Sequence, residues 1–137
     1  RQHIMFQNYC RIIRIEALTM IEMAKKQIYP AINDYVLKLS KTIKAKKALN
    51  AVYKTDTQIA KKLSSLNVNI YNEVLVLEHL LSLRKTIANP KEKAFFFKDK
   101  VLESMKNLRA FVDDAEKITD EKYWPFPSYT KLLFSVN

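Results

Sequence analysis

Residues 59–81 read IAKKLSSLNVNIYNEVLVLEHLL. Apolar residues recur here in steps of three and four, which is the spacing of one face of an α-helix. They are Ile59, Leu63, Leu66, Ile70, Val74, Leu77 and Leu81. Tyr71, Leu75 and Leu80 widen this apolar face. Because a helix with a wide apolar face must bury it against another element, the stretch predicts a long helix inside a helical bundle.

Two other stretches repeat the same spacing. The apolar or small residues of the first are Ile13, Ala17, Met20, Ala24, Ile28, Ala31, Tyr35 and Leu39. Those of the second are Ala94, Phe97, Val101, Met105, Leu108, Val112, Ala115 and Ile118. Short links join the three stretches, so we predict an all-α fold, an antiparallel bundle of three long helices in a single domain over residues 1–137. The alternative is an elongated coiled coil, which the wide apolar faces argue against.

Prolines interrupt the helical pattern at two places. Pro30 lies inside the first stripe, and its missing N–H predicts a kink or a break at residues 27–30. Residues 123–127, YWPFP, are expected to be extended because the two prolines restrict their own backbone and that of their neighbours. A short last helix is expected at residues 128–134, and residues 119–121 resemble a helix-capping site.

The links between the long helices contain typical helix-start residues. We expect the first helix to end within the basic residues 46–54, with Thr55 or Asp56 as the N-cap of the next helix. Asn89 is expected to cap the third helix, because the Pro90 that follows is tolerated at the first helical position.

The composition excludes several kinds of site. The chain has no glycine, whereas an average composition of about 7% would supply roughly ten. A mostly helical chain without phosphate-binding loops is expected. No uninterrupted apolar run is longer than the four residues of Val74–Leu77, so no membrane span is expected. A single cysteine, Cys10, and the absence of a signal-peptide pattern favour a cytoplasmic setting, and the helical start without Met suggests a piece of a longer protein.

Positive charge is concentrated in the first part of the chain. Residues 1–54 carry eleven Lys or Arg and three acidic residues. Within them a basic stripe runs without an acid: Lys38, Lys41, Lys44, Lys46, Lys47 and Lys54. Such a stripe is either a solvated helix face or, as the alternative function, the surface of a free-standing basic helical module that binds anionic partners. Nucleic acid is an unlikely partner, because the stripe lacks arginine and a run of interleaved aromatic residues.

Residues with catalytic or metal-binding chemistry do not gather in the sequence. His3 and His79 are far apart, and Cys10 has no second cysteine. The acidic residues at 113–121 are interpreted as a solvated helix end, because divalent sites need converging oxygens in a defined turn. Glu16, at the edge of an apolar stripe, is interpreted as a member of an ordinary ion pair. We therefore assign no catalytic, cofactor-binding or metal-binding residue.

The aromatic residues near the C-terminus are the strongest candidates for contact. Trp124, Phe126 and Tyr129 offer large amphipathic surfaces. They either close the core of this domain or anchor an interface with a partner subunit, and we keep them as possible interface residues.

Two segments carry a family resemblance. Residues 8–31 read NYCRIIRIEALTMIEMAKKQIYPA, and residues 108–113 and 123–129 read LRAFVD and YWPFPSY. They resemble the C-terminal region of type III glutamine synthetases, in which a helix containing "IEA" ends in an "LPA" element and a "WP-P-Y…LF" tail closes the domain. Tyr29 stands where leucine is usual in that family, whereas Trp124 and Pro127 match.

The resemblance implies a role within a larger enzyme. The parent would be a cytoplasmic ligase that joins ammonia to glutamate with ATP and magnesium or manganese, in a large ring-based homo-oligomer. No position here matches the metal-binding glutamates or nucleotide loops of that family, so this chain would be a non-catalytic C-terminal helical domain. Its partners would be the upstream catalytic domain and other subunits, with a structural or oligomer-contact role.

Overall fold

The computed structural model describes residues 2–127, and all its regular structure is helical. The elements are α1 (Gln2–Met23), the π-helical turn η1 (Ala24–Ile28), α2 (Tyr29–Ala48), α3 (Lys54–Leu83), the 3₁₀ turn η2 (Arg84–Thr86), α4 (Pro90–Phe96), the π-helical turn η3 (Phe97–Val101) and α5 (Leu102–Ile118). The described residues contain no strand, so the predicted all-α class is confirmed. No helix among residues 2–127 is long and apolar enough to cross a membrane.

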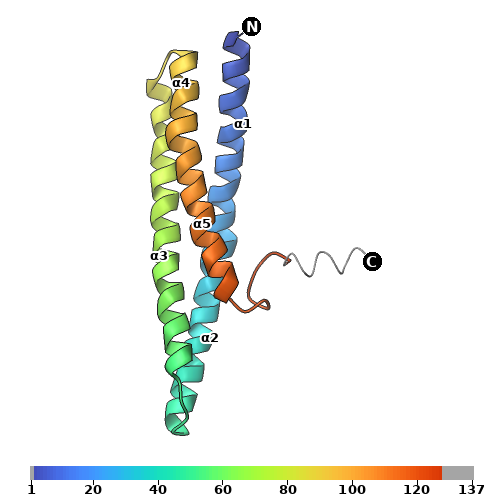
Figure 1. The fold of residues 1–137 in the computed structure, drawn as a ribbon. Coiled ribbons are helices and arrows are strands. Elements are labelled where there is room, and N and C mark those ends of the chain that lie inside the picture. Colours follow the sequence, from blue (N-terminus) through green and yellow to red (C-terminus); the bar gives the residue numbers. More distant parts are fainter. Residues whose placement is uncertain (1, 128–137) are drawn as a thin grey trace, which may run out of the picture.

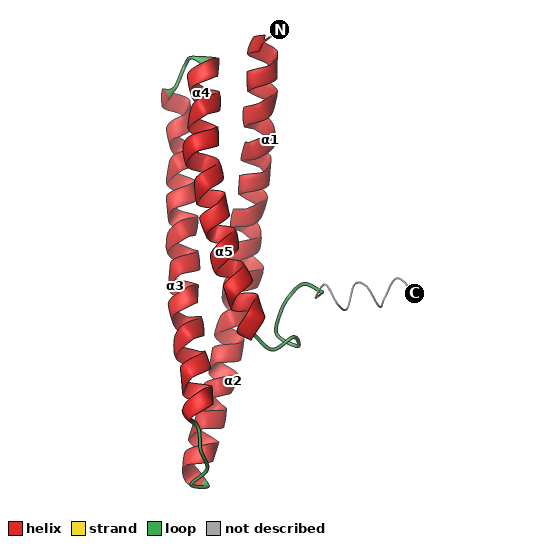
Figure 2. Ribbon diagram, viewed as in Figure 1, coloured by secondary structure: helices red, strands yellow, loops and turns green. Residues whose placement is uncertain are grey.

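The elements join into three long helical rods (Figures 1 and 2). The first rod is α1, η1 and α2, the second is α3, and the third is α4, η3 and α5. Figure 1 shows α3 returning beside α2, and α4–α5 running back between α1 and α3. Because α5 ends partway along the molecule, the far parts of α2 and α3 project beyond it as a pair. We call residues 40–62 of this pair the arm and the remainder of the helices the body.

The core is built from the predicted apolar stripes. Its largest fully buried side chains come from all three rods: Phe97, Ile32, Leu63, Ile70, Leu77, Leu108, Val74 and Val101. Tyr71 and Leu75, which were expected to widen the buried face of α3, are instead 43% and 47% exposed. The rods that pack on α3 cover a narrower face of it than the sequence pattern predicts.

A π-helical turn stands at the site where the sequence predicts a kink. The N–H of Tyr29 donates to the carbonyl of Ala24, one residue further back than in an α-helix. Pro30 follows directly, in the first turn of α2, where its missing N–H is best tolerated. The chain stays helical through this site, so the break that we considered is absent, while the kink remains a prediction.

An asparagine supplies the left-handed residue that ends α2. Asn50 has φ of 56°, a conformation that glycine adopts most easily and asparagine next. The N–H of Ala51 donates to the Lys46 carbonyl at 2.9 Å and the N–H of Asn50 to the Lys47 carbonyl at 3.2 Å. This pair of bonds is a Schellman motif, built here without glycine.

The two predicted N-caps have different outcomes. The first is wrong: α3 begins at Lys54 with Tyr53 as its N-cap, so Thr55 and Asp56 lie inside its first turn. The second is confirmed, because Asn89 Oδ1 accepts the N–H groups of Lys91 and Glu92 at 2.9 and 3.1 Å. Asn89 has the extended backbone that a cap requires, whereas Asp56 is already helical and bonds to Lys46.

The segment after α5 turns back without forming a helix within the described residues. The Thr119 hydroxyl donates to the Ala115 carbonyl at 2.6 Å, so it closes α5 rather than starting another helix. Asp120 Oδ1 accepts the N–H of Lys122 at 2.9 Å in a local turn. The short helix expected at residues 128–134 lies outside the described residues.

Candidate interface site

The aromatic tail forms one wall of an apolar groove. Trp124 and Phe126 are half-buried and pack against the core cluster. With α1, η1 and α5 they enclose a groove of about 320 Å³. Its apolar lining is Met20, Met23, Ala24, Ile28, Leu108, Val112, Trp124 and Phe126. Two of the three predicted interface residues therefore share one site, and Tyr129 lies outside the described residues.

Local turns and one ring contact position this wall. The N–H of Tyr123 donates to the Asp120 carbonyl at 2.9 Å, and the N–H of Trp124 to the Glu121 carbonyl at 3.3 Å. The ring of Tyr123 packs on that of Tyr35 in α2, with centroids 5.3 Å apart. The tail is thus tied to both α5 and α2 before it reaches the groove. Burial, followed by the nearby charge of Asp120, raises the pKa of Tyr35 above its ordinary value.

Charged residues of α5 form the rim of the groove. Arg109, Asp113 and Glu116 line it beside the apolar floor, and all three are exposed. Asp113 and Glu116 form no ion pair within 4 Å with any residue in the described range, whereas neighbouring Asp114 lies 3.6 Å from Lys117. An apolar floor with carboxylates at its edge suits an apolar side chain flanked by cations.

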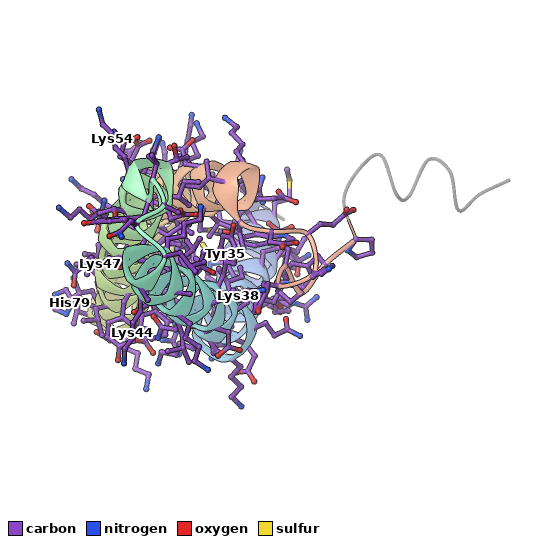
Figure 3. All side chains as sticks on the ribbon, turned by 90° about the horizontal axis from the view of Figure 1, so that it is seen from below. Tyr35, Lys38, Lys44, Lys47, Lys54 and His79 are labelled. Carbon is purple, nitrogen blue, oxygen red and sulfur yellow. The ribbon has the colours of Figure 1, made fainter. Side chains whose placement is uncertain are left out.

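The candidate catalytic groups stay apart in the structure. His3 is at the start of α1, and His79 is exposed on α3 (Figure 3). Cys10 is buried, and burial is the main cause that raises the pKa of its thiol, which keeps it protonated. Glu16 is exposed. Residues 2–127 contain no group of three His, Cys, Asp or Glu side chains placed to hold a metal ion.

Two carboxylates act as ties between helices. Glu73 Oε2 accepts the hydroxyl of buried Ser104 at 2.7 Å and so joins α3 to α5. Glu78 Oε2 accepts Lys25 Nζ, also at 2.7 Å, and joins α3 to η1. Both glutamates lie in the stretch 59–81, where the sequence pattern alone did not reveal their partners.

The sequence analysis also missed a buried polar residue. Asn67 is only 3% exposed, and its amide donates to the Tyr29 carbonyl at 3.2 Å and to Asn33 Oδ1 at 3.0 Å. It therefore ties α3 to the first rod beside Pro30. Its position directly after Leu66 in the apolar stripe was the available sign, since a polar residue on a buried face requires a partner.

A second apolar groove, of about 510 Å³, lies between α1 and α4. Its lining consists of Met5, Phe6, Tyr9, Ala94 and Phe95 with Lys91 and Lys98. Periodicity could not predict it, because it depends on how closely the start of α1 approaches α4.

Comparison with known proteins relates the chain to one family. A family model described as "Glutamine synthetase C-terminal domain" matches residues 1–47. A glutamine synthetase of Butyrivibrio fibrisolvens is 30% identical over 138 residues, which span 99% of this chain and 20% of that protein. A type-3 glutamine synthetase of Dictyostelium discoideum is 26% identical over 98% of this chain and 19% of its own length. A glutamine synthetase of Bacteroides fragilis is 24% identical over the same shares.

The chain spans about one fifth of the length of these relatives. No solved structure gives a significant match. The resemblance expected from residues 8–31 and from the aromatic tail is confirmed: the chain is related over nearly its whole length to glutamine synthetases and, over residues 1–47, to their C-terminal domain.

Proposed function

We propose that this chain is the non-catalytic C-terminal helical domain of a type III glutamine synthetase. The parent would ligate ammonia to glutamate with ATP and magnesium or manganese in the cytoplasm, through a catalytic domain upstream. The observation that supports this most is the match of 99% of the chain to about one fifth of a glutamine synthetase. In this proposal the three rods serve as an antiparallel bundle, bent near Pro30, that carries contact surfaces rather than a reaction centre.

The proposed role is structural, at contacts with the catalytic domain or with other subunits of a homo-oligomer. Trp124 and Phe126 support it, because they line a groove with both apolar surface and carboxylates that form no ion pair with residues 2–127. Tyr129 completes the proposed anchor set. Aromatic side chains placed in this way contribute a large share of the energy of many interfaces.

Replacing Trp124 by alanine in the full-length enzyme tests the role. We expect a lower melting temperature or a smaller assembly by sedimentation velocity, because the groove loses its largest wall. Phe95→Ala is the matched control, since Phe95 is a 54% exposed aromatic residue in the other groove. Unchanged assembly size and melting temperature in Trp124→Ala would refute the proposed role.

The alternative function, a basic module that binds anionic partners, rests on the basic stripe. This alternative is supported by the exposed lysines at the end of the arm (Figure 3). Retention on DNA or acidic vesicles at low salt that fades as salt is raised would favour this alternative.

A further inference from the structure

The end of the arm exposes apolar side chains that the bundle does not use. Leu49 is 78% exposed, Val52 is 83% exposed and Tyr53 is 37% exposed. They lie at the turn between α2 and α3, where Figure 1 shows the two helices meeting far from α5. Together with Lys44, Lys47 and Lys54 we call them the arm tip.

The arm that ends in this tip is strongly basic. Residues 40–62 contain seven lysines and a single acidic residue, Asp56. That acid is already neutralised, because Lys46 Nζ lies 2.6 Å from its Oδ2. Lys47 Nζ lies 5.2 Å from the centre of the Tyr53 ring. Figure 3, which looks onto the tip, shows the three lysines spread along one edge of it, with Lys47 between Lys54 and Lys44. A surface that is complementary to the tip is therefore apolar at its centre and acidic at its edge.

The turn presents these residues in a defined shape. The Schellman motif at Asn50 fixes the end of α2, and the Lys46–Asp56 ion pair ties it to the start of α3. A preorganised surface loses less conformational entropy on binding than a free loop does.

The groove beneath the aromatic tail has the complementary character. Its floor is apolar, and two carboxylates, Asp113 and Glu116, stand at its rim with one cation, Arg109. The segment 113–121, which supplies these two carboxylates, carries five acidic residues and one lysine. Its volume of about 320 Å³ is at the lower end of the roughly 300–1,000 Å³ usual for ligand pockets, which suits aliphatic side chains such as Leu49 and Val52.

A chain cannot bring its own tip to its own groove. The groove is lined by Ala24 and Ile28, and the 20 residues of α2 separate these from the tip. At a rise of 1.5 Å per residue the separation is about 30 Å. Two copies with antiparallel arms would place each tip at the other's groove, which is the reciprocal pattern of a two-fold interface.

We propose that the arm tip of one copy docks into the acidic apolar groove of a second copy. Leu49 and Val52 fill the apolar floor, and Lys44 and Lys54 meet Asp113 and Glu116. The inference rests on the proposed contact role of the Trp124 groove and names its occupant.

Zero-length carbodiimide cross-linking of the full-length protein tests it, because this reagent joins only a lysine and a carboxylate that are in contact. We expect mass spectrometry to find links from Lys44 or Lys54 to Asp113 or Glu116, which the separation of about 30 Å within one chain forbids. A link from the tip to the adjacent Asp56 is expected within one chain and serves as an internal standard. Links from the tip to any other carboxylate outside the groove would overturn the proposal, as would links from Lys131 to the groove carboxylates or no tip-to-groove links at all.

Charge reversal provides the second arm of the experiment. Lys44→Glu with Lys54→Glu should lower the yield of tip-to-groove links at least tenfold, and Asp113→Lys with Glu116→Lys should do the same. Combining the two pairs should restore linking, since opposite charges face each other again. The control pair is Lys85→Glu with Lys100→Glu, at exposed sites outside both surfaces. Failure of the combination to restore linking contradicts the pairing.

An apolar variant separates packing from charge. Leu49→Ser with Val52→Ser should weaken linking without unfolding the protein, because both side chains are already exposed. Leu37→Ser with Val68→Ser, at residues 54% and 57% exposed on other surfaces, is the matched control. If Trp124→Ala alters assembly but no tip links form, the inference falls while the proposed function stands. If Trp124→Ala is inert and no tip links form, both fall.

Discussion

The body and the arm share two helices and differ in burial. In the body, α2 and α3 pack with the third rod, and residues such as Ile32 and Leu77 are completely buried. In the arm, residues 40–62, no residue is buried, although the same two helices continue. A helix pair leaves half of each apolar face without a partner, so the third helix is what turns an amphipathic pattern into a core. The arm is held by its turn, one ion pair, half-buried side chains such as Ile43 and Ile59, and its attachment to the body.

The largest test of this comparison substitutes one aliphatic residue in each region. Leu77→Ala in the body should lower the free energy of unfolding by about 2–5 kcal/mol, because it leaves a cavity among fully buried neighbours. Ile43→Ala in the half-buried interior of the arm should cost less than about 1.5 kcal/mol. Urea denaturation followed by circular dichroism measures both, and equal losses would mean that the arm has a core of its own.

The next effect is expected at the polar tie beside Pro30. Asn67→Ala removes the amide that bonds to the Tyr29 carbonyl and Asn33, so we expect a loss of about 1–3 kcal/mol in the free energy of unfolding. Asn72→Ala is the matched control, because Asn72 is an exposed asparagine of the same helix, and it should stay within about 0.5 kcal/mol. A loss in Asn72→Ala equal to that in Asn67→Ala would argue against a special tie.

The turn of the arm gives a smaller and local effect. Asn50→Ala should destabilise the arm by about 1 kcal/mol, because alanine has no easy access to a φ of 56°, whereas Asn50→Gly should be neutral or slightly stabilising. Amide hydrogen exchange should report the change in residues 40–62 and not at Leu77. Faster exchange throughout the body in Asn50→Ala would show that arm and body unfold as one unit.

The smallest effect concerns pH. The hydrogen bond from Lys25 to Glu78, the largest of its causes, raises the pKa of Lys25 above its ordinary value of 10.5. A raised lysine pKa adds stability that is complete below pH 10.5 and is lost as the pH rises through the folded pKa. We therefore expect the melting temperature of Glu78→Gln to fall slightly less than that of the original protein as the pH is raised through the folded pKa of Lys25. If the melting temperature depends on pH equally in both, the exposed pair contributes nothing to stability.

Periodicity predicted the rods because burial in a helix obeys a regular spacing. It located Leu63, Leu77 and Phe97 in the core without reference to any partner. The residue types in the links predicted the Asn89 cap, which depends on residues two and three positions away. The same reasoning failed at Thr55 and Asp56, where Asp56 had a competing partner in Lys46, ten residues earlier.

The candidate site could be predicted only in part, because it too depends on partners that are distant in the sequence. Trp124 and Phe126 were identified by their chemistry, but the groove that they line is made with Met20 and Leu108, far away in sequence. Asn67 and Ser104 bond to other helices, and no spacing rule gives such partners. The exposed tip at Leu49 and Val52 followed from where α5 ends, which is a property of the assembled bundle.

The uninterrupted first rod makes the arm a lever. Residues 2–48 are helical without a loop, and the π-helical turn at 24–28 lies beside the groove. A tilt of about 10° at this turn would move the tip by roughly 5 Å, about one helical turn. Small changes in packing near Trp124 would therefore cause large displacements of Leu49. In the same way, a force that displaces the tip would change the packing at the groove.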